Sequence, residues 1–299
     1  MKTKTSEVKE HSEFGGSQAE RIINCPGSVL LSRGVPNKTN DASEEGTAGH
    51  ACLEFIFNNR KLLKNKITRK QILDKAEESF TIGESGKKIY WTQDMIDYAL
   101  DALSWFNEQL SPSSTVYVEQ KLDASKFTTD DQGSTLDLAM ANWNARELLI
   151  ADYKYGKSVV NVENNSQLIY YALGMLVFLK GWSKFDRIRC VIIQPRAHHK
   201  DGPIREWVIS VDDAIVWGKR FKKAVNLALK PNAPLKYSDK YCFFCLGKKK
   251  CPVMKTKQTI NDFDEIPTDE KEVNVMAKAT KKASKKKASK KKVSKKSSK

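Results

Sequence analysis

The chain has 299 residues, of which 40% are hydrophobic and 29% charged, and it carries a formal net charge of +16. A chain of this length and composition can bury a full core as one large domain or two small ones, which excludes disorder throughout. It contains no run of about 20 apolar residues that could span a membrane, and its first residues lack the apolar core of a signal peptide. We therefore expect an intracellular, cytoplasmic protein without a membrane partner, located in the host cytoplasm if a phage encodes it.

The positive charge is concentrated at the C-terminal end. Residues 277–299 contain twelve Lys and no acid, which leaves the remaining chain at +4. Repeats of Ala, Ser and Lys cannot bury apolar surface, so we predict a disordered Lys-rich tail over 259–299. Such a block attracts phosphate backbones without reading base sequence, and a role in solubility or localisation is the alternative.

The apolar periodicity predicts a set of helices and strands after a flexible arm at 1–16. Helices are expected over 17–31 with a break at Cys25-Pro26-Gly27, from 47 onward, and over 92–110, 165–179 and 212–229. Strands are expected over 115–119, 134–143, 147–153, 187–194 and 207–210. This order predicts an α/β domain over 17–258, in which a mixed central sheet is flanked by helices in the order αβββαβ.

Two acids and a lysine fall at the predicted strands. Asp137 lies within the second strand of a three-stranded meander, and Asp152 ends the third strand. Antiparallel pairing of these neighbours can bring both carboxylates to one metal ion, and period-two geometry puts Lys154 on the same face as Asp152. Carboxylates bind hard divalent ions, and an ammonium can steer or deprotonate the attacking water, so the set indicates a metal-dependent phosphodiester hydrolase. Taken singly, the two acids are more simply explained as strand-end residues and Lys154 as a solvated side chain.

The motifs occur in the order seen in the PD-(D/E)XK nuclease superfamily, and the chain resembles its RecB-like exonucleases. The matching motifs are, in chain order, Gly46-x-x-x-His50, Gly133-x-x-x-Asp137, Asp152-Tyr153-Lys154-x-Gly156 and Gln167-x-x-x-Tyr171. The second element departs from the family, which more often has one residue fewer between Gly and Asp.

The resemblance implies roles for these residues. The side chains of His50, Asp137 and Asp152 and the backbone carbonyl of Tyr153 are expected to bind Mg²⁺ or Mn²⁺. Lys154 is expected to position the attacking water, while Gln167 and Tyr171 contact substrate or brace the site. By itself, His50 on an apolar helix is also typical of a core histidine. Glu54 and Glu119 are further possible ligands, each also explained as a surface acid or an ion-pair partner.

Four cysteines predict a second metal site. Cys242, Cys245 and Cys251 are spaced so that their thiolates can face one centre, and Cys25 is the candidate for a fourth ligand. RecB-like nucleases with one upstream and three clustered downstream cysteines hold a [4Fe-4S] cluster, so the resemblance implies such a cluster, with structural Zn²⁺ as the alternative. Cys52 and Cys190 lie in apolar runs and are expected to be core residues.

These features lead to a metal-dependent deoxyribonuclease, expected to be an exonuclease on single-stranded DNA or DNA ends. The resemblance places it in recombination, repair or phage genome processing. One alternative is a non-catalytic, cysteine-stapled protein that binds DNA through its basic tail. Another is a nuclease subunit that acts only with a recombinase or helicase partner.

Overall fold

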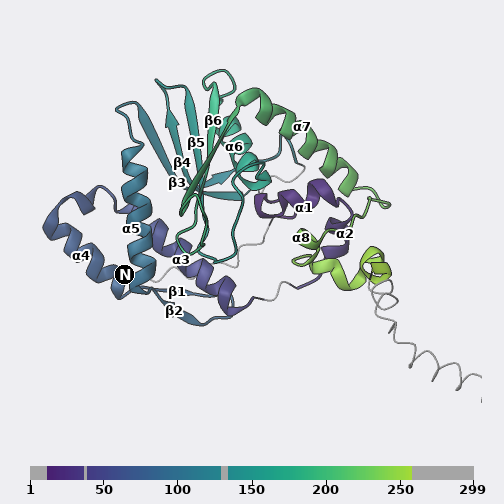
Figure 1. Cartoon of the computed structure of the whole chain (residues 1–299), viewed down its shortest axis with the longest axis horizontal. Coiled ribbons are helices and arrows are strands. Elements are labelled where there is room, and N and C mark those ends of the chain that lie inside the picture. Colours follow the sequence, from purple (N-terminus) through teal and green to yellow (C-terminus); the bar gives the residue numbers. More distant parts are fainter. Residues whose placement is uncertain (1–11, 37–38, 129–133, 258–299) are drawn as a thin grey trace, which may run out of the picture. The chain divides into compact units, whose positions relative to one another are not determined.

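The computed structural model describes residues 12–36, 39–128 and 134–257 (Figure 1). The chain divides into two units, Met1–Lys248 and Lys249–Lys299. The predicted Lys-rich tail lies outside the described residues. Among those described, no helix is both long and apolar enough to cross a membrane.

A five-stranded mixed sheet forms the centre of the first unit, in the order β3-β4-β5-β6-β7. Neighbouring strands are antiparallel except β5 and β6, which pair in parallel. The strands are β3 (Ser114–Leu122), β4 (Ser134–Asn142), β5 (Glu147–Tyr153), β6 (Arg187–Ile193) and β7 (Ile204–Ser210), with a separate hairpin of β1 (Phe80–Ile82) and β2 (Lys88–Tyr90). The predicted meander and the return strand β6 are confirmed, as is the mixed α/β architecture.

Helices cover both faces of this sheet. The helices of the described residues are α1 (Ala19–Asn24), α2 (Ser28–Ser32), α3 (Asp41–Asn58), α4 (Lys66–Glu77), α5 (Gln93–Glu108), α6 (Ser166–Phe178), α7 (Val211–Ala228) and α8 (Asp239–Cys242), with short 3-10 turns at Gly16–Gln18, Leu62–Lys64 and Leu246–Lys250. One core lies between the sheet and α3 and α5, and the other between the sheet and α6 and α7 (Figure 1). Burial of apolar side chains on both faces is the main stabilising term for such a layered fold.

The helix N-termini follow the capping residues. Thr92 and Asn165 cap α5 and α6 with side-chain oxygens that accept main-chain N–H bonds, as the predicted boundaries require. The start predicted for α3 at Thr47 is wrong, because the helix begins at Asp41 with Asn40 and Ser43 forming a capping box. Its polar first turn lacks apolar periodicity, so the sequence pattern did not reveal it.

The described part of the expected N-terminal arm packs against the domain. Phe14 is only 3% exposed and shares a small core with Ile22, Val29 and three residues of α7. The main-chain N–H of Gly16 donates to Ser134 Oγ at 2.8 Å, next to the start of β4. Residues 1–11 lie outside the description.

Candidate metal and hydrolytic site

Three adjacent strands place an acid at the same level of the sheet. The pairing of β4 with β5 ends at Leu138↔Ala151, and Asp137 and Asp152 lie directly beside this last pair. In the pairing of β3 with β4, Val118↔Leu138 and Gln120↔Leu136 flank the position that sets Glu119 opposite Asp137. The register therefore aligns Glu119, Asp137 and Asp152 across the sheet.

The backbone is irregular at this level. Glu119 has φ of 48°, in the left-handed region that a non-glycine residue rarely adopts. Leu136 and Leu138 lie two residues apart, yet they pack in the cores on opposite faces of the sheet. Regular alternation along β4 is thus broken at Asp137. Irregular backbone of this kind clusters at functional sites, where the surrounding structure holds it in place.

Helix α3 brings His50 to the acids. Its Nδ1 lies 3.4 Å from Asp137 Oδ1, and ligand atoms of His50, Glu119 and Asp137 all lie within 4.8 Å of one another. The other oxygen of Asp137 accepts the main-chain N–H of Tyr153 at 2.8 Å, which orients the carboxylate. The three side chains converge from one helix and two strands.

A close helix approach makes this geometry possible. A Cβ atom on Gly49, the residue before His50, would lie 2.7 Å from Cγ of the Tyr155 ring. Only a glycine allows α3 to come this near to the segment that follows β5. The helix therefore delivers His50 by contacting the chain immediately after Lys154.

Lys154 links Asp152 to α6. Its Nζ lies 2.8 Å from Asp152 Oδ2 and donates to Gln167 Oε1 at 3.0 Å. The amide of Gln167 in turn donates to the Tyr171 hydroxyl at 2.9 Å. The predicted set of Asp152, Lys154, Gln167 and Tyr171 therefore forms one connected chain of polar contacts.

The charges of the site act on one another. Burial opposes the charged form of His50, yet the carboxylate of Asp137 outweighs it and raises the pKa of His50. Burial also raises the pKa of Asp152, and the nearby Asp137 carboxylate adds to that effect against Lys154. For Asp137, the charges of His50 and Lys154 overcome burial and lower its pKa.

Lys154 remains in its ammonium form by the same balance. Burial acts to lower its pKa, but the charges of Asp152 and Asp137 outweigh burial and raise it. The lysine thus compensates charge that the two buried carboxylates would otherwise leave unpaired.

The chemistry of the donor set fits a hard divalent ion. Carboxylate oxygens and an imidazole nitrogen are ligands that Mg²⁺ and Mn²⁺ accept, and they contain no soft thiolate. Asp152 lies outside the tight group of His50, Glu119 and Asp137, where it faces Lys154. Glu54, one turn along α3 from His50, is exposed and does not join the group, whereas Glu119 does.

The structure does not test the expected roles of the Tyr153 carbonyl and of Gly133. The ring of Tyr153 is buried, and its main-chain N–H binds Asp137, while the ligand role of its carbonyl stays a prediction. Gly133 lies outside the described residues.

Three of the four predicted cluster ligands belong to the first unit, and Cys25 and Cys242 both contact the main chain of Lys236. Cys25 is close enough to Cys242 and Cys245 for their charges to add to burial in raising the pKa of the Cys25 thiol. The main chain of Lys236 donates to Cys25 Sγ at 3.3 Å, and that of Ser238 donates to Cys242 Sγ at 3.3 Å. Cys251 belongs to the second unit.

The other two cysteines behave as core residues. Cys52 and Cys190 are fully buried in the two main cores. Burial raises the pKa of each thiol to about 12, which disfavours the thiolate that a metal requires.

The sequence matches the family model described as protein of unknown function (DUF2800) over residues 11–298. The chain belongs to the DUF2800 family. The match includes the acids, the lysine and all six cysteines, so the candidate sites lie within the part of the chain that defines a DUF2800 protein.

Proposed function

We propose that this DUF2800 protein is a divalent-metal-dependent deoxyribonuclease with a PD-(D/E)XK-type core. The observation that carries the proposal is the convergence of Glu119, Asp137 and Asp152 from three adjacent strands, with His50 above them and Lys154 beside them. The αβββαβ order, with the acids on the second and third strands, supports the same assignment.

The residues divide into two roles. His50, Glu119, Asp137 and Asp152 hold the metal ion, which when bound supplies Lewis acidity and activates water for attack on a phosphodiester. Lys154, held between Asp152 and Gln167, donates to the attacking water or to a phosphate oxygen. Tyr171 braces Gln167 and thereby the lysine.

The test is cleavage of end-labelled single- and double-stranded DNA by the purified full-length chain with Mn²⁺. We expect Asp152→Asn to abolish cleavage and Lys154→Ala to slow it roughly 10²–10³-fold, the usual cost of losing one aligned donor. Glu54→Gln, which removes an exposed acid on α3, is the matched control and should cleave normally. An inactive wild-type protein, or full activity in both site variants, would overturn the proposal.

The same assay addresses the mode of cleavage and the partners. An exonuclease should degrade linear DNA and leave circular single-stranded DNA intact, because it needs an end. Binding that survives Asp152→Asn without any cleavage by the wild type favours the non-catalytic, tail-dependent alternative. A helicase or recombinase that restores cleavage to an otherwise silent wild-type protein favours the subunit alternative.

We further propose that Cys25, Cys242, Cys245 and Cys251 bind a [4Fe-4S] cluster. The convergence of Cys25 on Cys242 and Cys245 supports it, since a shared centre links segments over two hundred residues apart. Anaerobically purified protein should be brown, with visible absorption that bleaches on reduction and disappears in Cys242→Ser. Cys190→Ser is the control. A colourless wild type that contains stoichiometric zinc would assign the site to Zn²⁺.

A further inference from the structure

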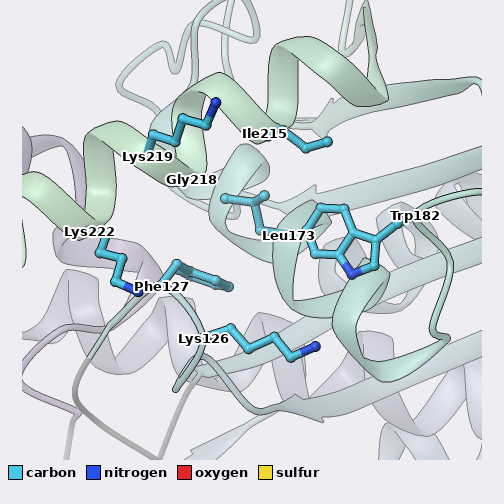
Figure 2. A pocket seen from close by; sticks show the side chains of 8 residues that line it. All are labelled: Lys126, Phe127, Leu173, Trp182, Ile215, Gly218, Lys219 and Lys222. Atoms are coloured by element: carbon cyan, nitrogen blue, oxygen red, sulfur yellow. The ribbon is translucent and has the colours of Figure 1, made fainter.

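A hollow on the α7 side of the sheet is distinct from the metal site. Its cavity of about 360 Å³ has a floor of Phe127, Leu173 and Ile215, and Trp182 forms one wall (Figure 2). Phe127 and Leu173 are buried, whereas Trp182 is 37% exposed. The cavity therefore presents aromatic and aliphatic surface that reaches solvent at an indole.

Lysines surround this apolar floor. Lys219 and Lys222 project from α7 and Lys126 from the loop after β3, and all three are exposed (Figure 2). A second hollow of about 500 Å³ continues along α7, sharing Lys219 and Lys222 and adding Lys223 and Lys230. No carboxylate lines either hollow in the described part of the chain.

The lysines share one face of the helix. Lys222 and Lys223 follow Lys219 by three and four residues, so both lie one turn further along the same side of α7, and Lys230 extends this stripe beyond the helix end. A rise of about 1.5 Å per residue spreads the stripe over roughly 16 Å, long enough to contact several successive phosphates of an extended strand.

Gly218 keeps the cavity open. It lies in the interior of α7, where a glycine costs about 0.5–1 kcal/mol relative to alanine. A Cβ there would meet Leu173 Cδ2 at 3.4 Å, an ordinary contact, so packing against Leu173 does not require glycine. Its lack of a side chain instead leaves room in the cavity above the buried Leu173, between Lys219 and Trp182.

We infer that this surface binds single-stranded nucleic acid, with a base in the cavity against Trp182 and the phosphates along the lysine stripe of α7. Proteins that bind single strands without sequence preference stack the bases on aromatic side chains and bind the phosphates along a positively charged groove. Bases in a duplex are stacked and cannot enter the cavity. The inference concerns binding alone and does not depend on hydrolysis at the metal site.

The first test maps the contact by photo-crosslinking. The full-length wild type, in EDTA to prevent cleavage, is irradiated with a dT oligonucleotide carrying one 5-iododeoxyuridine, and crosslinked peptides are identified by mass spectrometry. Crosslinks to Trp182 or Phe127 are expected. Crosslinks confined to the Lys-rich tail would overturn the inference.

The second test measures affinity in EDTA for the same oligonucleotide and for its duplex. We expect Trp182→Ala to weaken single-strand binding roughly 5–100-fold, as loss of one stacked base predicts, with little change for the duplex. Trp182→Phe should restore part of the affinity. Gly218→Met, which fills the cavity and leaves every lysine in place, should weaken single-strand binding to a similar extent.

The salt dependence of binding distinguishes phosphate contacts made by the α7 lysines from a general effect of positive charge. Lys222→Ala should reduce the slope of log affinity against log salt by about 0.7, the value for one phosphate contact on a single strand. Lys70→Ala, an equal charge change at an exposed position of α4, should leave the slope unchanged.

Unchanged single-strand affinity in both Trp182→Ala and Gly218→Met would overturn the inference. An acidic protein would then be the next occupant of this surface to test. If the wild type forms the crosslink but does not cleave DNA, the proposed function fails and the binding inference stands.

Discussion

Glu119 has a left-handed backbone in the middle of a strand, where neither a glycine nor a turn accounts for it. A residue in such a conformation costs of order 1–3 kcal/mol unless its surroundings hold it there. Its carboxylate lies with the imidazole of His50 and the carboxylate of Asp137 in the one compact group of potential ligands among the described residues. The conformation places this acid in the group with His50 and Asp137 that we propose binds the metal.

A substitution at Glu119 tests that explanation. We expect Glu119→Gln to weaken Mn²⁺ binding at least about 10-fold by calorimetry, because it removes a negative ligand, and even outer contacts of metal sites contribute that much. Glu54→Gln makes the same chemical change on α3 and should bind Mn²⁺ as the wild type does. Equal affinities in the two variants would exclude Glu119 as a ligand.

Two glycines of α3 differ in a way that stability measurements can resolve. Gly49→Ala places a Cβ 2.7 Å from the buried Tyr155 ring, whereas nothing lies within 4 Å of a Cβ on Gly46. We expect Gly49→Ala to lower the free energy of unfolding by about 1–3 kcal/mol through overpacking. Gly46→Ala should raise it by roughly 0.5–1 kcal/mol. Urea unfolding checks both, and equal effects would contradict the close approach of α3.

At the scale of elements, α6 joins the candidate site to the sheet. Most of its side chains are buried, and Gln167 and Tyr171 on its first turns hold Lys154. Asn165 fixes where the helix begins, because its side chain accepts the main-chain N–H groups of Gln167 and Leu168. The cap therefore affects both stability and the position of the lysine.

Loss of this cap should be measurable. Asn165→Ala is expected to lower the free energy of unfolding by about 1 kcal/mol, the usual contribution of an N-cap. The exposed Asn161 contributes only its main-chain carbonyl to this contact, so Asn161→Ala is the matched control and should have little effect. A larger loss in the control than in Asn165→Ala would show that the cap is not formed.

At the scale of the whole molecule, the first unit is closed by contacts between its two sequence ends. The segment with Phe14, Ile22 and Val29 packs against the end of α7, and the main-chain N–H of Gly27 donates to the carbonyl of Pro234 at 2.9 Å. Cys25 lies in the same region, where its Sγ accepts the main-chain N–H of Lys236 at 3.3 Å. Residues far apart in sequence thus determine whether the domain is complete.

Gly27 offers a test of this closure. A Cβ at Gly27 would lie 2.6 Å from the carbonyl oxygen of Ala233 and 2.7 Å from Leu235 Cδ2, so main chain as well as side chain must move. We expect Gly27→Ala to lower the free energy of unfolding by about 1–3 kcal/mol. Gly156→Ala, where nothing lies within 4 Å of the added atom, should be tolerated. Equal midpoints in denaturant would show that the two ends do not need this contact.

The sequence by itself determined the local features. Apolar runs located the five strands of the main sheet and the helices α5 and α6, and motif spacing singled out His50, Asp137, Asp152 and Lys154 as candidates. These signals are local, because periodicity and capping depend on residues a few positions apart. The hairpin β1–β2 and helix α4 were missed, since three-residue strands and a mostly polar helix have too little apolar pattern.

Only the tertiary structure decided which residues meet. The register between β3 and β4 aligned Glu119 with Asp137, and the packing of α7 against α6 placed lysines around an apolar cavity with Trp182. Such pairings join positions that are distant in sequence, and their cost in chain entropy is offset only by burial in the complete fold. Strand register and helix packing therefore determine which side chains come together. The local sequence pattern does not contain this information.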